Sequence, residues 1–206
     1  MYRVYFKRVL DLLLAFIALP VLFIVLVILG PLIYLQDKGT IFYNAKRLGK
    51  DGKIFKMYKF RTMNMNVPDI RNDDGSTFNS EDDPRLTKVG KLIRKTSIDE
   101  MPQLLNVIKG EMSIIGPRPD LPEHSSLYEG NEARKLEVRP GITGYNQAYY
   151  RNIVPWKERL QHDIYYIDNL SFSLDIKILF KTAVSVLKCE DVFVTDKESI
   201  ELKRMK

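Results

Sequence analysis

Residues 12–35 read LLLAFIALPVLFIVLVILGPLIYL, and no charged side chain interrupts this stretch. About 20 consecutive apolar residues are enough for a helix to cross the hydrocarbon core of a bilayer. The stretch is too long for the apolar region of a secretory signal peptide, and no small-residue cleavage site follows it, so we expect the chain to retain it. A plain transmembrane helix is the simplest interpretation, because membrane helices tolerate a proline such as Pro20.

The charges on either side of this stretch favour a different topology. Basic residues precede it, and a denser basic set follows it between residues 38 and 61. Positively charged flanks stay on the cytoplasmic side of a membrane, and one spanning helix cannot keep both flanks there. We therefore predict that residues 1–36 form a re-entrant helix–break–helix, which enters and leaves the membrane on one face. The break is expected near Pro20 or at Gly30-Pro31.

The composition restricts the class of partner. The 206 residues carry a net charge of +6, and the pI is about 9.2. A basic protein suits an anionic partner, and nucleic acid, anionic lipid and a phosphorylated substrate all stay open at this point. The single cysteine, Cys189, excludes an intrachain disulfide, so the fold does not depend on an oxidising compartment.

Beyond the apolar stretch we expect one α+β domain, mostly helical, over residues 37–190, followed by a charged tail over residues 191–206. Two short strands, 41–44 and 53–60, should form a β-hairpin through Asp51-Gly52. The polar segment 64–83 is expected to be a surface loop. Apolar residues at helical spacing predict three further helices, around 86–93, at 157–168 and at 170–188. The basic helix around 86–93 could lie against the core and lipid headgroups at once, and the apolar helix at 170–188 could pack in the core or at the membrane surface.

The most informative motif is Thr-Ser-Ile-Asp-Glu-Met-Pro-Gln-Leu at 96–104, with the adjacent carboxylates Asp99 and Glu100. Ser97 and Glu100 match a capping box, but Pro102 would then fall inside the helix. Pro102 falls in the first turn if Asp99 is instead the N-cap of a helix that runs to about residue 109. The positive end of that helix would favour an ionised carboxylate, which can attack phosphorus. From these residues alone, capping and catalysis stay equally open.

Two other motifs suit phosphate. Lys59-Phe60-Arg61-Thr62 ends a predicted strand with basic and hydroxyl side chains, which indicates a phosphate contact or a solvated surface. In Gly116-Pro117-Arg118-Pro119 the prolines fix the backbone around Arg118 and aim its guanidinium group, with an ordinary surface turn as the alternative. The glycines of 138–144 allow close approach to a ligand or to another segment. The aromatic residues after them could stack on a base or belong to a core.

Together these motifs resemble the bacterial sugar transferases, in their small monotopic phosphoglycosyl transferase form. The matching pieces are 59–63, 94–103, 106–113, 116–119 and 139–144. The resemblance implies an enzyme of the bacterial inner membrane, with its catalytic domain on the cytoplasmic face. Such an enzyme transfers a phosphosugar from a nucleotide sugar, usually a UDP-sugar, to polyprenyl phosphate (undecaprenyl phosphate) and releases UMP. This is the first membrane step of polysaccharide or glycoconjugate synthesis.

The resemblance also implies roles for single residues. Asp99 would be the nucleophile that forms an aspartyl-phosphosugar intermediate, and Glu100 its acid/base or metal partner, with Mg²⁺ bound by both. A cation and guanidinium groups are needed because the attacked diphosphate is itself negatively charged. The substrate-binding candidates are Arg94 and Arg118, then Lys59, Arg61 and Thr62, then Arg139 and Gln147 on the nucleotide side, with Asp163 and Asp175 as supporting acidic residues.

Some points stay open. The family typically breaks its membrane helix at a Ser-Pro pair, whereas Leu19 precedes Pro20 here. A hypothesis from a different class is a membrane-anchored basic protein for anionic lipid or nucleic acid, in which Asp99-Glu100 only caps a helix. The enzyme hypothesis needs membrane lipid and the two substrates as partners, and no nucleic acid. Neither the sugar, nor the glycan pathway, nor the oligomeric state follows from the sequence.

Overall fold

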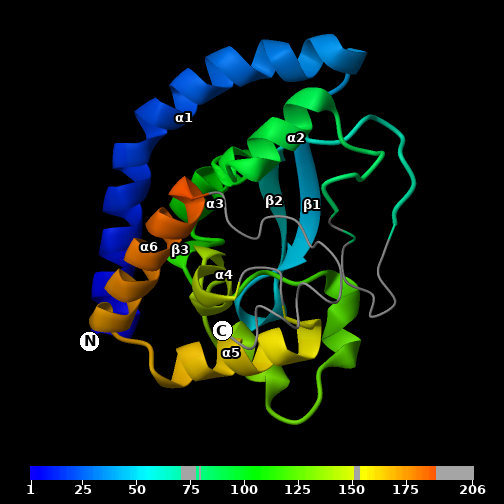
Figure 1. Ribbon diagram of the computed structural model, residues 1–206. Coiled ribbons are helices and arrows are strands. Elements are labelled where there is room, and N and C mark those ends of the chain that lie inside the picture. Colours follow the sequence, from blue (N-terminus) through cyan, green and yellow to red (C-terminus); the bar gives the residue numbers. More distant parts are fainter. Residues whose placement is uncertain (71–77, 79, 151–153, 189–206) are drawn as a thin grey trace.

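A computed structural model describes residues 1–70, 78, 80–150 and 154–188 of the chain (Figure 1). Six elements precede the catalytic motif. They are a short π-helical turn (Tyr2–Phe6), helix α1 (Lys7–Asp37), strand β1 (Phe42–Leu48), the 3₁₀ turn η2 (Lys50–Gly52), strand β2 (Ile54–Phe60) and helix α2 (Lys88–Lys95). The predicted charged tail over residues 191–206 and Cys189 lie outside the described residues.

The second half of the described chain is mostly helical. It contains the 3₁₀ turn η3 (Ile98–Glu100), α3 (Gln103–Lys109), β3 (Ser113–Ile115), the 3₁₀ segments η4 (Pro122–Leu127) and η5 (Glu132–Glu137), β4 (Gly141–Thr143), α4 (Tyr145–Tyr149), α5 (Trp156–Asp168) and α6 (Phe172–Leu187). The prediction of a mostly helical mixed domain with a small β-hairpin is therefore confirmed.

Helix α1 is continuous from Lys7 to Asp37, so the predicted break near Pro20 or at Gly30-Pro31 is wrong. Each proline removes one intrahelical hydrogen bond and crowds the preceding turn, which bends a helix without having to end it. Figure 1 shows the result: α1 runs along one side of the molecule and then turns over the top of α2. It is also the one described helix that is long and apolar enough to cross a membrane.

The N-terminal end of α1 is bound to the globular domain by polar side chains. Asp11 is buried and accepts hydrogen bonds from Ser113 Oγ at 3.0 Å and from the Ile114 backbone N–H at 2.9 Å. One turn earlier, Lys7 Nζ lies 2.7 Å from Asp175 Oδ2. Buried carboxylates with such partners hold this end of the helix on β3 and α6.

The C-terminal end of α1 is bound to the same domain through Arg61, which follows the last residue of β2. Two guanidinium nitrogens of Arg61 reach the two carboxylate oxygens of Asp37 at 2.6 and 2.7 Å. The same guanidinium donates to the backbone carbonyls of Ile33, Thr40 and Met63. These bonds use every donor that an arginine side chain has, so Arg61 closes the end of α1 onto β2.

The β-hairpin forms at the predicted turn. β1 and β2 pair antiparallel from Phe42 opposite Phe60 to Leu48 opposite Ile54. Asp51 and Gly52 have φ values of 57° and 73°, the left-handed conformation that Asp-Gly hairpin turns require. The first strand extends four residues beyond the predicted end at residue 44 because its pairing with β2 continues up to this turn.

Close backbone contacts fix α2 and the second small sheet. A Cβ added at Gly90 would lie 1.9 Å from the carbonyl oxygen of Thr62, so α2 packs directly on the end of the β2 segment. β3 and β4 pair in parallel, and a Cβ at Gly141 would lie 2.1 Å from the Gly116 nitrogen. Of the two functions proposed for the glycines of 138–144, this contact supports close approach to another segment.

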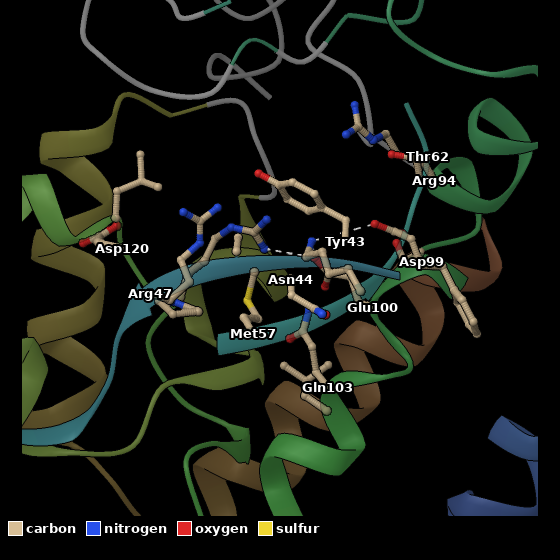
Figure 2. Close-up of a pocket in the computed structure, with 18 of the residues that line it drawn as sticks. Tyr43, Asn44, Arg47, Met57, Thr62, Arg94, Asp99, Glu100, Gln103 and Asp120 are labelled. Atoms are coloured by element: carbon tan, nitrogen blue, oxygen red, sulfur yellow. Dashed lines mark hydrogen bonds and ion pairs between the residues drawn. The ribbon is translucent and has the colours of Figure 1, made fainter. Parts of the chain in front are cut away.

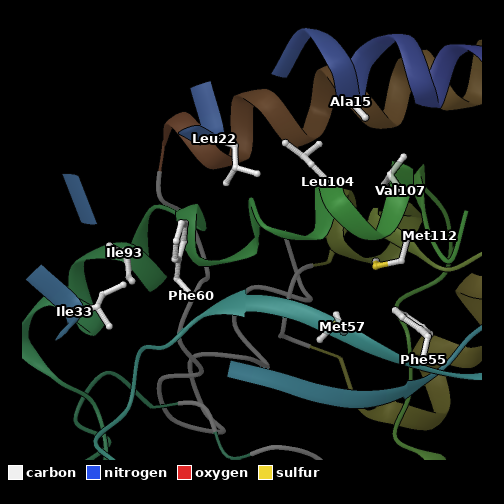
Figure 3. Packing of buried hydrophobic residues seen from close by; sticks show 10 residues of the cluster. All are labelled: Ala15, Leu22, Ile33, Phe55, Met57, Phe60, Ile93, Leu104, Val107 and Met112. Atoms are coloured by element: carbon white, nitrogen blue, oxygen red, sulfur yellow. The ribbon is translucent and has the colours of Figure 1, made fainter. Parts of the chain in front are cut away.

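The main core lies between α1, α3 and the hairpin (Figure 3). Ala15, Leu22 and Ile33 of α1 pack there with Leu104 and Val107 of α3, among other buried residues. The remaining apolar face of α1 is exposed, as is one side of α6. The large exposed residues on these two helices include Leu13, Phe16, Ile17, Val21, Phe23, Ile24, Val27, Ile28, Leu35, Phe172, Ile176, Phe180 and Leu187. Such a contiguous apolar surface is typical of lipid contact.

We predict that Arg61→Met lowers the free energy of unfolding by roughly 2–3 kcal/mol, because it removes the ion pair with Asp37 and leaves the Ile33, Thr40 and Met63 carbonyl oxygens without the guanidinium donor. The control is Arg3→Met, which removes a pair with Glu137 whose side chains are 46% and 43% exposed, and which should cost less than about 1 kcal/mol. Chemical denaturation in detergent measures both variants. Equal losses would contradict a special role for the Arg61 contact.

Candidate active site

A cavity of about 1330 Å³ opens between the β-hairpin, the 97–101 turn, the turn after β3 and the first half of α5. In Figure 2, Asp99, Glu100 and Arg94 lie at one end, Asp120 lies at the other, and Arg47 of β1 lies between them. The volume exceeds the usual 300–1,000 Å³ of small-molecule pockets, so it has room for a substrate with more than one part. Described residues of the polar segment 64–83 also line it, which makes that predicted surface loop a wall of the site.

The backbone turns sharply into the catalytic motif. Ser97 has φ 58° and ψ 15°, the left-handed conformation, and Ile98–Glu100 form a single 3₁₀ turn. Helix α3 begins only at Gln103, with Pro102 as its N-cap. The prediction that Asp99 is the N-cap is therefore wrong, and the charge of Asp99 does not depend on the first amides of α3. Proline has no backbone N–H, so it would remove a hydrogen bond inside a helix but costs none just before the first turn. Pro102 therefore precedes the helix.

Side-chain cations, and not the helix end, neutralise the two carboxylates. Lys59 Nζ lies 2.6 Å from Glu100 Oε1 and 3.7 Å from Asp99 Oδ2, so one ammonium group serves both. Arg118 Nη1 approaches the same Glu100 oxygen at 3.5 Å. Lys59 comes from β2 and Arg118 from the proline-flanked turn after β3, two segments that are far apart in sequence.

These partners separate the acidities of the two carboxyl groups. Burial raises the pKa of Asp99 to about 6, an effect that Lys59 opposes and the neighbouring Glu100 charge reinforces. Burial also acts on Glu100, but Lys59 and Arg118 more than offset it and lower the pKa of Glu100 to about 2. Glu100 is therefore a fixed anion at neutral pH, and Asp99 is the less stabilised and more reactive carboxylate.

A second charged group lies at the far end of the cavity. Its Asp163 was a candidate from the sequence, but Lys135 and Asp120 were not. The ammonium of Lys135, whose side chain is 4% exposed, lies 2.6 Å from Asp120 Oδ2 and 2.9 Å from Asp163 Oδ2. Trp156 Nε1 donates to Asp120 Oδ1 at 3.2 Å. Asp120 directly follows the 116–119 motif, and that adjacency is the signal that could have pointed to it. Lys135 has no such signal, because its two partners are far from it in sequence.

Seven of the nine substrate-binding candidates line the cavity. They are Lys59, Arg61, Thr62, Arg94, Arg118, Gln147 and Asp163. Two of these residues have structural contacts there: Arg61 binds the end of α1, and the Thr62 carbonyl accepts the Thr87 N–H at 3.0 Å. The two amide atoms of Gln147 are buried and have no hydrogen-bond partner among the described residues, so its amide group is available for a ligand.

Arg139 and Asp175 are not brought to the cavity. Arg139 Nε donates to the Gly110 carbonyl at 2.7 Å, at the end of α3. Asp175 accepts hydrogen bonds from Tyr2 at 2.6 Å, Lys7 at 2.7 Å and Tyr166 at 2.8 Å, and it is 2% exposed. Both residues therefore hold the fold around the site, which their position in the sequence could not indicate.

The chemistry of the two carboxylates fits Mg²⁺. Magnesium is usually held by one or two carboxylates together with substrate phosphates and water. Asp99 and Glu100 already share one cationic group, Lys59, which shows that their oxygens converge on a positive charge. Among the described residues no group of three or more acidic, histidine or cysteine side chains could hold a metal. A metal at this pair would therefore share its coordination with substrate.

Comparison with known proteins shows the family of this chain. Residues 2–189 match the model of a family described as bacterial sugar transferase, and the chain belongs to that family. It is a phosphoglycosyl transferase. It is 42% identical over 195 residues to the uncharacterized sugar transferase EpsL of Bacillus subtilis, covering 95% of this chain and 94% of EpsL. It is 40% identical over 191 residues to the exopolysaccharide production protein ExoY of Sinorhizobium fredii, with 87% and 84% covered.

A longer relative carries a more specific name. The chain is 38% identical over 189 residues to the UDP-N-acetylgalactosamine-undecaprenyl-phosphate N-acetylgalactosaminephosphotransferase of Aeromonas hydrophila. The match covers 89% of this chain but 44% of that protein. The chain thus corresponds to nearly all of the short relatives and to less than half of this longer one.

We predict that Arg118→Met lowers kcat/KM for sugar transfer by roughly 100-fold, because it removes a cation that faces Glu100 and the cavity. Arg139→Met is the matched control, since Arg139 carries the same charge but lies outside the cavity, and its effect per folded molecule should stay below about threefold. Steady-state kinetics on detergent-solubilised protein measure both. A larger loss in the Arg139 variant would reverse the assignment.

Proposed function

We propose that this protein transfers a sugar 1-phosphate from a UDP-sugar to undecaprenyl phosphate, releases UMP and so begins the assembly of a polysaccharide or other glycoconjugate. The observation that carries the proposal is the Asp99-Glu100 pair, which shares Lys59, faces Arg118 and lies at one end of a large cavity. The name of the A. hydrophila relative supports these classes of donor and acceptor.

In the first step the Asp99 carboxylate attacks the phosphorus that carries the sugar. A bond forms from the carboxylate oxygen to phosphorus, the bond to the oxygen between the two phosphates breaks, and UMP leaves with that electron pair. Lys59, Arg94 and Arg118 are positioned to offset the negative charge that otherwise repels a carboxylate from a diphosphate. Mg²⁺ bound by Asp99 and Glu100 would supply further neutralisation of the phosphoryl oxygens.

In the second step an oxygen of undecaprenyl phosphate attacks the same phosphorus, and Asp99 leaves as a carboxylate. The product is the lipid-linked diphosphosugar. Of the two roles open to Glu100, metal partner fits better than acid/base, because Lys59 and Arg118 keep its pKa at about 2 and it holds no proton at neutral pH. Asp120, Asp163 and Gln147 are our candidates for binding the nucleoside, because they line the same cavity as the acidic pair.

The membrane arrangement that we propose is re-entrant, with residues 1–36 in the cytoplasmic leaflet of the bacterial inner membrane and residues 37–190 as the catalytic domain on the cytoplasmic face. It is supported by the contacts at the two ends of α1, since Asp11 and Asp37 both bind the same globular domain. A bent helix held at both ends exposes its apolar middle to lipid without placing its ends on opposite sides.

We predict that Asp99→Asn abolishes UMP release, by about a thousandfold or more, because an amide is not a nucleophile toward phosphorus. Purified protein is incubated with Mg²⁺, undecaprenyl phosphate and a panel of UDP-sugars. Asp51→Asn is the matched control, because Asp51 is exposed in the hairpin turn and asparagine tolerates its positive φ. Undiminished release in Asp99→Asn would contradict the mechanism. If the native protein released no UMP from any UDP-sugar, the result would favour the binding-protein hypothesis.

We predict that Arg3→Cys and Lys50→Cys, each in a Cys189→Ser background, react with an impermeant thiol reagent from the same side of sealed vesicles. Residue 3 precedes α1 and residue 50 lies in the hairpin after it. In the re-entrant arrangement both ends of α1 lie on the same face of the membrane, so both cysteines should be accessible from that face. Labelling of both variants is compared between right-side-out and inside-out vesicles. Labelling from opposite sides would show a spanning helix.

A further inference from the structure

Asn106 is a completely buried polar residue of α3 that binds the outer edge of β2. It is 0% exposed. Its side-chain oxygen accepts the Tyr58 backbone N–H at 3.0 Å, and its side-chain nitrogen donates to the Lys56 carbonyl at 2.8 Å and to Glu111 Oε2 at 2.7 Å. β1 pairs with the opposite edge of β2, so the Asn106 amide takes the place that a backbone peptide of a third strand would have.

This contact lies between the two segments that form the active site. Lys59 directly follows Tyr58 in β2, and its ammonium lies 2.6 Å from Glu100. The Asp99-Glu100 pair directly precedes the Met101-Pro102 step into α3. Asn106 therefore joins the strand that carries the cation to the helix that follows the carboxylates, and Figure 1 shows that helix beside β2.

The far end of α3 is fixed as well. The backbone oxygen of Asn106 accepts the N–H groups of Glu111 at 3.0 Å and Met112 at 3.2 Å. Arg8 donates to the Val107 carbonyl at 2.7 Å and to the Ile108 carbonyl at 3.2 Å. Because the helix end cannot shift freely, the Asn106 side chain decides how β2 lies against it, and so how Lys59 lies against the carboxylates.

We propose that Asn106 is a positioning residue for the transfer reaction, one that acts through Lys59 and contacts no substrate. The inference rests on the proposed function. An amide is the side chain suited to this position, because it accepts from one backbone N–H and donates to one carbonyl at the same time. Leucine has a similar size and does neither, and aspartate keeps the acceptor but loses both donors.

The test is a double-mutant cycle with Asn106→Leu and Lys59→Met, read as the single-turnover rate of UMP release. In the native background Asn106→Leu should lower this rate about 30-fold, with KM for the UDP-sugar changed less than about threefold. In the Lys59→Met background the same change should cost less than about threefold, because the group that Asn106 positions is gone. Equal losses in both backgrounds, or an unchanged rate in the native one, would overturn the proposal.

Two further variants separate positioning from stability. Val107→Ala shortens a fully buried neighbour on α3 and leaves the Asn106 hydrogen bonds to β2 in place. It should lower thermal stability while leaving the rate per folded molecule within about twofold. Asn106→Asp replaces Asn106→Leu if the leucine variant does not fold, and should also slow release. If the native protein releases no UMP from any UDP-sugar, the proposed function fails. If only the Asn106 cycle is additive, the positioning role fails alone.

Discussion

One ammonium group shared by two adjacent carboxylates is the interaction on which the rest of the site depends. Two neighbouring carboxyl groups removed from water repel each other and lose hydration, so they stay ionised only beside a cation. Lys59 supplies that cation between Asp99 and Glu100, and Arg118 makes its ion pair with Glu100. The asymmetry leaves Asp99 as the carboxylate with more to gain from bonding to phosphorus.

The segment of chain that carries Lys59 also binds helix α1. Two residues after Lys59, Arg61 binds Asp37 at the end of α1, while Asp11 fixes the other end of α1 on β3. Polar contacts of the kind found in water-soluble domains therefore hold the ends of a helix whose apolar face is exposed along its middle. In the re-entrant arrangement that we propose, the cavity would lie close to lipid, where one substrate of the proposed reaction has to stay.

Local patterns in the sequence predicted local structure well. The Asp51-Gly52 turn, the amphipathic α2 and the final helix were predicted correctly because their residues carry turn geometry or helical spacing within a few positions. Predictions that depended on a partner far away in sequence were less accurate. Asp99 was assigned to a helix end, but its charge partner is forty residues away in β2, and Arg139 and Asp175 look like site residues until their buried contacts are known.

By itself the sequence determined the apolar N-terminal helix, the mixed mostly helical domain, the family motifs and the acidic pair, because each depends on residues that are neighbours along the chain. Only the tertiary structure decided that α1 bends without breaking, that Arg61 is bound to Asp37, that Lys135 joins Asp120 to Asp163, and that Asn106 links α3 to β2. These are contacts between segments far apart in sequence, and their energy comes from burial and charge pairing that no single segment contains.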